Sequence, residues 1–484
     1  MKVPTPEERQ RLTPRTKLFW TFCALLVYLI CSQVPLYGIN KGGNSDPFYL
    51  MRVILASNRN TLMELGISPI ITSGMIMQVL VGAKIIDVDL STPRDQRLYQ
   101  AASKILGIVM CLGSSVAYVL SGWYGPIQQL GSVTAVLIIV QLFVAGMIVV
   151  MLDDLLSKGY GIAGGLNLFL VTNICENILW QMFSPMTYNQ GGQTQFEGAI
   201  VSVFHLLLTD PNKGHALNKV LFREGLPNVS NVVATIVVFL VVIYVEGLKY
   251  DVMIKSSQAG SRTVPFPIKL FYTSNMPIIL LTGVISNVYF FSQIFYKRYE
   301  KNPFVRLLGV WAEDPASGRS RPIWGISYLI SPPEGVFDLV ARPLHSLFYI
   351  SFMLMACGLF ARAWIELSSS GPNEVYAMIQ RQFGGEMHAD DNYKSAKIVL
   401  ATARDKEGGK GLLKELRKVI PTASLVGGMC IAALSIFADL FGAIGTGTGI
   451  LMAVTIIFDM YDKLTRDLGP GGVQKLLEDF WKDA

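Results

Sequence analysis

The feature that most constrains this chain is the number of long apolar stretches it contains. A helix needs about 20 predominantly apolar residues to cross the hydrocarbon core of a bilayer. Ten stretches of the sequence approach or meet this length, at 18–36, 67–86, 105–123, 131–152, 161–182, 230–248, 268–293, 344–366, 421–440 and 443–461. The sequence therefore predicts an all-α polytopic membrane protein with ten transmembrane helices.

The composition agrees with this class. Of the 484 residues, 51% are hydrophobic and only 16% are charged, whereas about 25% are charged in a typical soluble domain. The six cysteines all lie inside apolar stretches. Their spacing indicates neither a disulfide framework nor a zinc site.

Motifs that carry catalysis are missing from the sequence. It has no phosphate-binding GxxxxGKS/T run and no HExxH, and its four histidines are scattered. The run 442–449 (GAIGTGTG) lacks a lysine and opens an apolar stretch, which favours close helix packing over nucleotide binding. Asp153 and Asp154 end an apolar stretch beside a glycine turn, so they are interpreted as a cap or as interfacial charges. We expect no enzyme, no catalytic residue, no metal and no cofactor.

The basic residues predict the orientation of the chain. With ten spans both termini lie on one side, and about two thirds of the Lys and Arg residues fall on that side, which makes it cytosolic. We divide the chain into a cytosolic N-tail (1–17), an N-terminal half (18–182), a loop on the opposite side (183–229), a C-terminal half (230–461) and a cytosolic C-tail (462–484).

Two cytosolic loops, at 249–269 and 367–418, are large and basic. One interpretation is that they are ordinary solvated loops that follow the positive-inside rule. The other is that they form a docking surface for a polyanion. The residues proposed to face such a partner are Lys255, Arg262, Arg404, Lys406 and Lys410.

Several apolar residues have the spacing of a pore constriction. Ile67 and Ile71 are four residues apart, as are Leu166 and Leu170, so each pair lies on one helix face. Each residue taken singly is also consistent with ordinary packing. A ring of such side chains would block water and ions by dewetting and yet deform around a passing chain. Completing the proposed ring are Ile279, after a proline, and Met452, after a glycine-rich run.

Polar residues inside the spans have two interpretations. They include Thr72, Ser114, Glu176, Asn275 and Asn287. The simpler interpretation is interhelical hydrogen bonding, worth about 0.6 kcal/mol per bond. A helix seam held by a few such bonds would also open with modest input, which suits a gate.

The segment 46–66 is amphipathic, too short and too charged to span a membrane. We interpret it as a re-entrant element, which is tolerated only inside protein or in a wet cavity. Ten spans also divide into five and five, and an odd number per half inverts the second half relative to the first.

Several ordered runs give the chain a specific resemblance. They are ASNRNTLMELGISPIITSG at 56–74, SKGYGIAGGLNLFLVTNICE at 157–176, FEGAI at 196–200, FPIKLFYTSNMPIIL at 266–280, WIEL at 364–367, IPTA at 420–423 and GAIGTGTGILMAVTII at 442–457. On these runs the chain closely resembles the SecY family of protein-conducting channels, in the form found in eukaryotic Sec translocons. The resemblance covers roughly 16–367 and 412–461.

The resemblance implies a clamshell of two inverted five-helix halves that conducts signal-bearing polypeptides and releases transmembrane segments sideways. By position, the six apolar residues above match the family's pore ring. Thr72, Ser114 and Asn287 match the polar cluster of its lateral gate, which spans two and three form against spans seven and eight. The segment 46–66 matches its plug, with the candidate residues Met51, Ile54, Leu55, Arg59, Leu62 and Glu64.

The resemblance also implies the surroundings of the chain. They are the endoplasmic reticulum membrane, with the loop 183–229 in the lumen. Its expected partners are beta and gamma subunits, the ribosome on the two cytosolic loops, signal sequences and nascent chains, a Sec62/Sec63-type post-translational complex, and the lipid bilayer.

The sequence departs from the family pattern at several places. Ser114 stands where relatives usually have Gln, and GIAGGLN at 161–167 stands where they usually have GLGSGIS. The tip of the loop 255–262 lacks the usual Arg-Gly pair, and 371–411 is unlike the family. Without the motif match, a small-solute secondary transporter with inverted repeats fits best. A polytopic membrane enzyme is a third possibility, which the missing nucleophile or metal cluster disfavours.

Overall fold

The computed structural model describes residues 14–39, 57–58, 60–82, 85–86, 93–120, 124, 131–190, 193–209, 214, 220–221, 223, 226–256, 263–273, 275–298, 302–313, 320–333, 336–367, 371–383, 398–400 and 410–468. Long helices dominate this part of the chain. They are α2 (Pro14–Gln33), α4 (Ser68–Gly82), α5 (Pro93–Leu120), α7 (Ser132–Leu155), α8 (Gly165–Phe183), α11 (Val229–Glu246), α12 (Met276–Arg298), α16 (Pro343–Leu367), α18 (Lys410–Leu440) and α19 (Gly447–Leu468). Each stretch expected to span the membrane lies mostly on one of these helices.

Shorter elements lie between the long helices. The helical ones are η1 (Leu62–Glu64), η2 (Leu156–Tyr160), α9 (Ala199–Thr209), α13 (Pro303–Leu308), α14 (Ile326–Leu329), α15 (Val336–Ala341) and α17 (Pro372–Phe383). The strands are β1 (Thr187–Gln190), β2 (Gln193–Phe196), β3 (Lys249–Ser256), β4 (Thr263–Lys269), β5 (Val310–Glu313), β6 (Ser320–Trp324) and β7 (Ile398–Leu400).

Six helices within the described ranges are long and apolar enough to cross a membrane. They cover Arg15–Gln33, Leu98–Leu120, Ser132–Tyr160, Val229–Glu246, Pro343–Glu366 and Leu412–Leu440. Helix α7 shows how such a helix divides its surface. Val133, Val136, Val140 and Val144 form an exposed stripe, whereas Ile138 and other apolar residues on the opposite face are buried. A helix that is apolar all round and exposes one face suits a lipid-facing position.

Some helix boundaries differ from those expected. The stretch expected at 268–293 begins as strand, because β4 continues to Lys269, and the helix starts only at Met276. Pro277 in the first turn explains this start, since proline is favoured there and disfavoured in helix interiors. Helix α18 starts at Lys410 and continues through Pro421, because its first turns pack into a separate apolar cluster described below.

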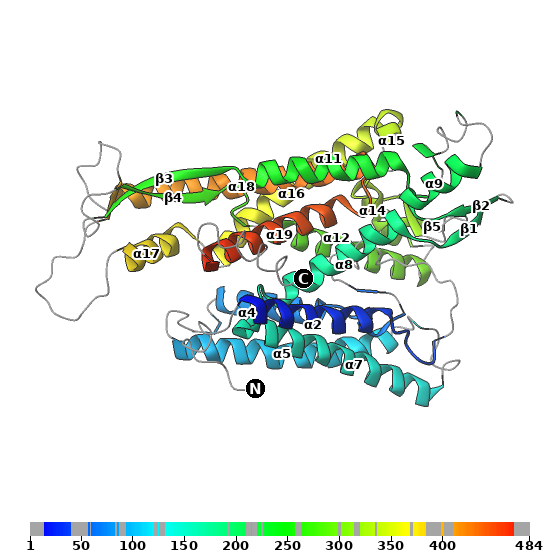
Figure 1. The fold of residues 1–484 in the computed structure, drawn as a ribbon, viewed down its shortest axis with the longest axis horizontal. Helices are drawn as coiled ribbons and strands as arrows, with labels where there is room; N and C mark the ends of the chain where they lie inside the picture. The colour runs from blue at the N-terminus through cyan, green and yellow to red at the C-terminus, as the bar shows by residue number, and fades with distance from the viewer. Residues whose placement is uncertain are drawn as a thin grey trace, which may run out of the picture.

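The long helices form two groups. Figure 1 shows α2, α4, α5 and α7 side by side in one layer, and α11, α16 and α18 in another, with α8 and α19 between them. Contacts along α4–α5 and α5–α7 build the first group, and contacts along α16–α18 and α11–α18 build the second. Helices α8 and α19 contact each other and join the groups.

The strands lie at opposite ends of the bundle. Figure 1 places β3, β4 and α17 at one end, and the hairpins β1–β2 and β5–β6 with α9 at the other. The first end carries a three-stranded antiparallel sheet of order β4-β3-β7, with Ile254 opposite Leu400. The two large basic loops of the sequence therefore contribute strands to one sheet.

A shared apolar cluster supports that sheet. It contains Val252 and Ile268 from the strands, Ile379 from α17, and Leu416 and Ile420 from α18, all buried. The apolar side chains come from both loops, so the sheet, α17 and the start of α18 form one packed unit. We call this unit the loop platform.

Candidate pore and lateral gate

All six residues expected to form a ring meet in one apolar cluster. Ile67, Leu170 and Met452 are buried within it, and Ile71, Leu166 and Ile279 pack against it. Ile67 immediately precedes α4 and Ile71 lies in it, whereas the other four come from α8, α12 and α19. Helix α12 packs against α16 of the second group, so both helix groups contribute. An apolar cluster to which both helix groups contribute has the chemistry needed to exclude water and ions.

The start of α8, which carries two of the ring residues, is fixed by Asp153. One carboxylate oxygen of Asp153 accepts the Leu166 N–H at 3.2 Å and the Ser157 hydroxyl at 3.4 Å. This supplies a partner to an N–H that would otherwise be orphaned in the first turn of the helix. The interpretation of Asp153 as a cap is therefore confirmed. Gly165 permits the approach, because a Cβ there would lie 2.7 Å from the Asp153 Cα atom.

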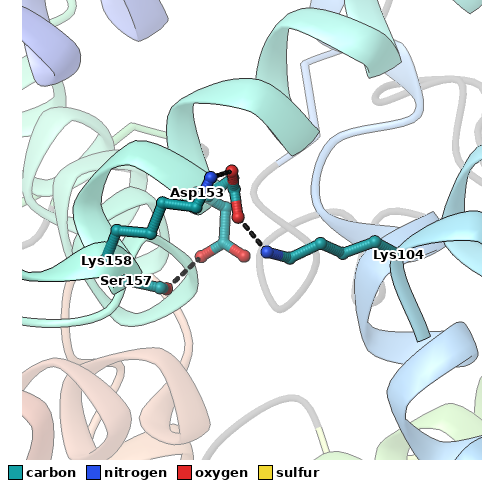
Figure 2. A network of polar contacts seen from close by, with 5 residues as sticks. Lys104, Asp153, Ser157 and Lys158 are labelled. Carbon is teal, nitrogen blue, oxygen red and sulfur yellow. Dashed lines mark hydrogen bonds and ion pairs between the residues drawn. The ribbon is translucent and has the colours of Figure 1, made fainter. Parts of the chain in front are cut away.

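The neighbouring Asp154 ties two helices together. Its carboxylate pairs with Lys104 of α5 and, at 2.5 Å, with Lys158. Figure 2 shows the lysine of α5 reaching across to the turn that holds Ser157 and Lys158. These ion pairs join α5 to the end of α7, next to the helix that carries Leu166 and Leu170.

The expected gate residues lie on three different helices. Thr72 of α4 is partly buried, and its hydroxyl donates to its own helix at Ser68 O (2.9 Å) and Pro69 O (3.2 Å). Ser114 lies partly buried on α5, and Asn287 lies on α12 with its side chain outside the described set. Among the described side chains, no hydrogen bond joins Thr72 to Ser114. Helix α4 contacts α16 across the seam between the helix groups.

Only the end of the expected plug falls within the described residues. Met51, Ile54, Leu55 and Arg59 lie outside them, whereas Leu62 and Glu64 form η1 immediately before the ring.

The backbone around η1 is held by the end of α2. Leu36 N donates to Asn60 O at 2.9 Å, and Leu62 N donates to Val34 O at 3.0 Å. Pro35 and Thr61 form an antiparallel bridge between the same two segments. The segment before the ring is therefore fastened to the first span.

Glu64 is a buried carboxylate, only 1% exposed. It accepts hydrogen bonds from the Tyr124 hydroxyl at 2.9 Å and from the Asn60 N–H at 3.1 Å. Asn60 has a φ of 58°, an uncommon value for a residue other than glycine. Tyr124 was not predicted as a site residue, because a lone tyrosine in a loop carries no pattern.

The proposed ribosome-facing residues are only partly described. Lys255 lies in β3 and Lys410 opens α18, but their side chains are outside the described set, as are Arg262, Arg404 and Lys406 altogether. What the structure adds is that the loops carrying them meet in the loop platform.

A buried arginine organises the loop at 183–229. Arg223 donates to Phe196 O at 2.7 Å, Glu197 O at 3.3 Å and the Ser202 hydroxyl at 2.8 Å. Burial lowers the pKa of Arg223. Gly198 lies against Ser184, where a Cβ would be 2.7 Å from backbone atoms. The FEGAI run therefore has a structural role in holding this loop.

Comparisons with known proteins agree with this arrangement. The SecY family model matches residues 61–461, and the model described as the plug domain of Sec61p matches residues 26–59. The protein transport protein Sec61 subunit alpha of Pyrenomonas salina is 48% identical over 456 residues, covering 94% of this chain and 89% of the relative. The subunit of the same name from Dictyostelium discoideum is 46% identical, covering 96% and 94%.

Solved structures show the same fold. A protein-conducting channel aligns with a TM-score of 0.69 at 27% identity, covering 96% of this chain and 94% of the other. Sec61 in the canine ribosome-channel complex from the endoplasmic reticulum aligns with a TM-score of 0.66 at 27% identity, with the same coverage. The family model that matches most of the chain, the relatives of 46–48% identity over nearly its whole length and the shared helical fold together place this chain in the SecY family.

Proposed function

We propose that this chain is the pore-forming subunit of a protein-conducting channel. It passes signal-bearing polypeptides across the endoplasmic reticulum membrane and releases apolar segments sideways into lipid. The observation that carries the proposal is the meeting of Ile67, Ile71, Leu166, Leu170, Ile279 and Met452 in one cluster between the helix groups. Relatives and structural neighbours that transport or conduct proteins support it.

The proposed mechanism is that of a gated, passive pore. A signal sequence enters the seam between α4 and the α12–α16 pair and gains about 25 cal/mol for each square ångström of apolar surface it buries. Each polar bond across the seam opposes this by only about 0.6 kcal/mol, so a moderately apolar segment suffices to open it. The plug segment 46–66 then leaves the pore and the ring widens. A partner, such as a translating ribosome, supplies the direction of movement.

The two halves are proposed to be inverted repeats. The supporting observation is that equivalent helices make equivalent contacts. In the first half α4 contacts α5, α5 contacts α7, and α2 contacts α8; in the second α12 contacts α16, α16 contacts α18, and α11 contacts α19. Helices α8 and α19, the fifth of each half, meet between the groups. An odd number of spans per half inverts the second relative to the first.

Orientation and partners follow from the same proposal. The loop platform faces the cytosol, as do both termini, and it docks the ribosome. A ribosome-channel complex among the structural neighbours supports this. Beta and gamma subunits, and a Sec62/Sec63-type complex for finished chains, complete the proposed assembly.

The test is transport by the reconstituted chain. Vesicles containing it should make a signal-bearing polypeptide resistant to added protease, whereas a matched polypeptide without a signal should stay sensitive. Equal sensitivity of both polypeptides, together with saturable uptake of a small solute, would favour the secondary transporter.

A further inference from the structure

Two residues that precede α12 contact α19 at different positions along its length. Lys269, the last residue of β4, places its ammonium 3.1 Å from the Asp459 carboxylate and 2.9 Å from the Asp462 carboxylate. The same ammonium lies 5.3 Å from the centre of the Phe458 ring. Strand β4 of the loop platform is therefore joined by charge to the cytosol-proximal part of α19.

Asn275, the residue immediately before α12, makes the second contact. It is 4% exposed, and its side-chain amide donates to the Thr455 hydroxyl and lies 3.5 Å from Met452 O. Its own carbonyl accepts the Ile279 N–H at 3.2 Å. The Asn275 side chain thus contacts the backbone of Met452, and the Asn275 carbonyl closes the helical turn that ends at Ile279.

The partners on α19 share one face of that helix. Met452, Thr455, Asp459 and Asp462 follow one another at intervals of three, four and three residues, which places them in one stripe. At 1.5 Å per residue, the stripe extends about 15 Å from the ring towards the platform. Lys269 and Asn275 therefore contact α19 at two points along its length.

The charges around Lys269 make it difficult to replace. Burial acts to lower the pKa of Lys269, but the hydrogen bonds and charges of Asp462 and Asp459 outweigh it and raise the pKa above its ordinary value. Glu246, which ends α11 and is 6% exposed, also lies within electrostatic range of Lys269 and both aspartates. Three carboxylates, one buried and two about a third exposed, thus lie near one ammonium, and its removal leaves them without this compensating charge.

We propose that Lys269 and Asn275 are positioning residues that hold the start of α12 in register with α19, and so couple the loop platform to the pore ring. The inference rests on the proposed function, because it assigns a task to Ile279 and Met452 as ring residues. A partner that pulls on β4 moves Lys269 directly, and α19 follows through its aspartates. The Asn275 contact keeps Ile279 and Met452 together while this happens.

The test measures the resting ion conductance of the full-length chain, in the complex in which it purifies, in planar bilayers. Thr455→Val removes the hydroxyl acceptor with little change in shape, and Lys269→Met removes the ammonium. The loss of one such hydrogen bond, about 1 kcal/mol, corresponds to a roughly fivefold higher ratio of open to closed channels. We expect both variants to show that increase.

Matched variants separate positioning from general damage. Lys269→Arg keeps the charge and should restore the wild-type conductance. Arg342→Met removes an ion pair with Asp338 of α15, away from α19, and should leave conductance unchanged. If Lys269→Met does not fold, the near-isosteric Thr455→Val still decides the outcome.

Ile71→Asp, which places a charge in the ring, distinguishes two kinds of failure. Suppose that Ile71→Asp raises the resting ion conductance, whereas Thr455→Val and Lys269→Met leave it at the wild-type value. That result overturns this inference alone. If Ile71→Asp channels do not conduct ions at rest, the ring assignment is wrong and the proposed function is overturned as well.

Discussion

The buried contact between Glu64 and Tyr124 yields the sharpest prediction. Tyr124→Phe deletes one hydroxyl and keeps the aromatic ring, which is only 9% exposed. The hydroxyl donates to a carboxylate that is 1% exposed, at 2.9 Å. Hydrogen bonds to charged groups contribute about 1.5–3 kcal/mol, and after the change the same carboxylate oxygen keeps only its other partners, among them the Asn60 N–H.

The expected consequence is a weaker anchor for η1, the described end of the expected plug segment. Because η1 lies directly before Ile67, weakening its anchor should raise the fraction of resting channels that conduct ions. The loss of 1.5–3 kcal/mol corresponds to a shift of roughly 10- to 150-fold in the closed-to-open ratio, if the closed state alone makes the contact. Single-channel recording of the reconstituted protein measures that fraction.

A nearby tyrosine serves as the control. Tyr37 is 75% exposed, so Tyr37→Phe should leave the open fraction at the wild-type value. Indistinguishable recordings from Tyr124→Phe and wild type would refute the reasoning, because they would show that the Glu64 contact is equally strong in the open and closed channel.

The remaining predictions concern the ring, the gate and the loop at 183–229. Ile71→Asp should make resting vesicles permeable to ions, since one carboxylate hydrates an apolar constriction; a dye-release assay that shows intact vesicles would count against the ring. Asn287→Leu should lower the hydrophobicity that a signal needs, and a graded series of signals with an unshifted threshold would contradict its place in the gate. Asn228 should remain unglycosylated in microsomes, because its side-chain oxygen accepts the Arg223 N–H at 2.9 Å and the Ser230 hydroxyl donates to Leu221 O at 2.9 Å; a shift on endoglycosidase treatment would contradict this.

The helical framework was predictable because its signal is local. An apolar stretch of about 20 residues indicates a span without reference to the rest of the chain, and most of each such stretch lies on a helix. Boundaries were less predictable where a helix extends beyond its apolar stretch. Helix α18 begins at Lys410 among polar residues, where packing against the loop platform, rather than hydropathy, determines its start.

The candidate site was predictable only in part. The convergence of the six apolar residues followed from matched motifs, since apolar residues in apolar helices carry little information on their own. The Glu64–Tyr124 bond and the Lys269–Asp459 pair join residues that are 60 and 190 positions apart. Nothing in a single sequence marks such pairs. The same reason explains why β7 was missed, because a strand of three residues pairs with β3 across most of the C-terminal half.

The most direct test of polypeptide conduction is a photocrosslink from the ring. A photoreactive residue at position 71 would be presented with ribosomes that carry stalled nascent chains, with either an intact or a disabled signal. The account predicts a crosslink to the nascent chain only when the signal is intact. Intact ribosome binding without any crosslink would contradict conduction through this ring, and loss of both would make the transporter the better interpretation.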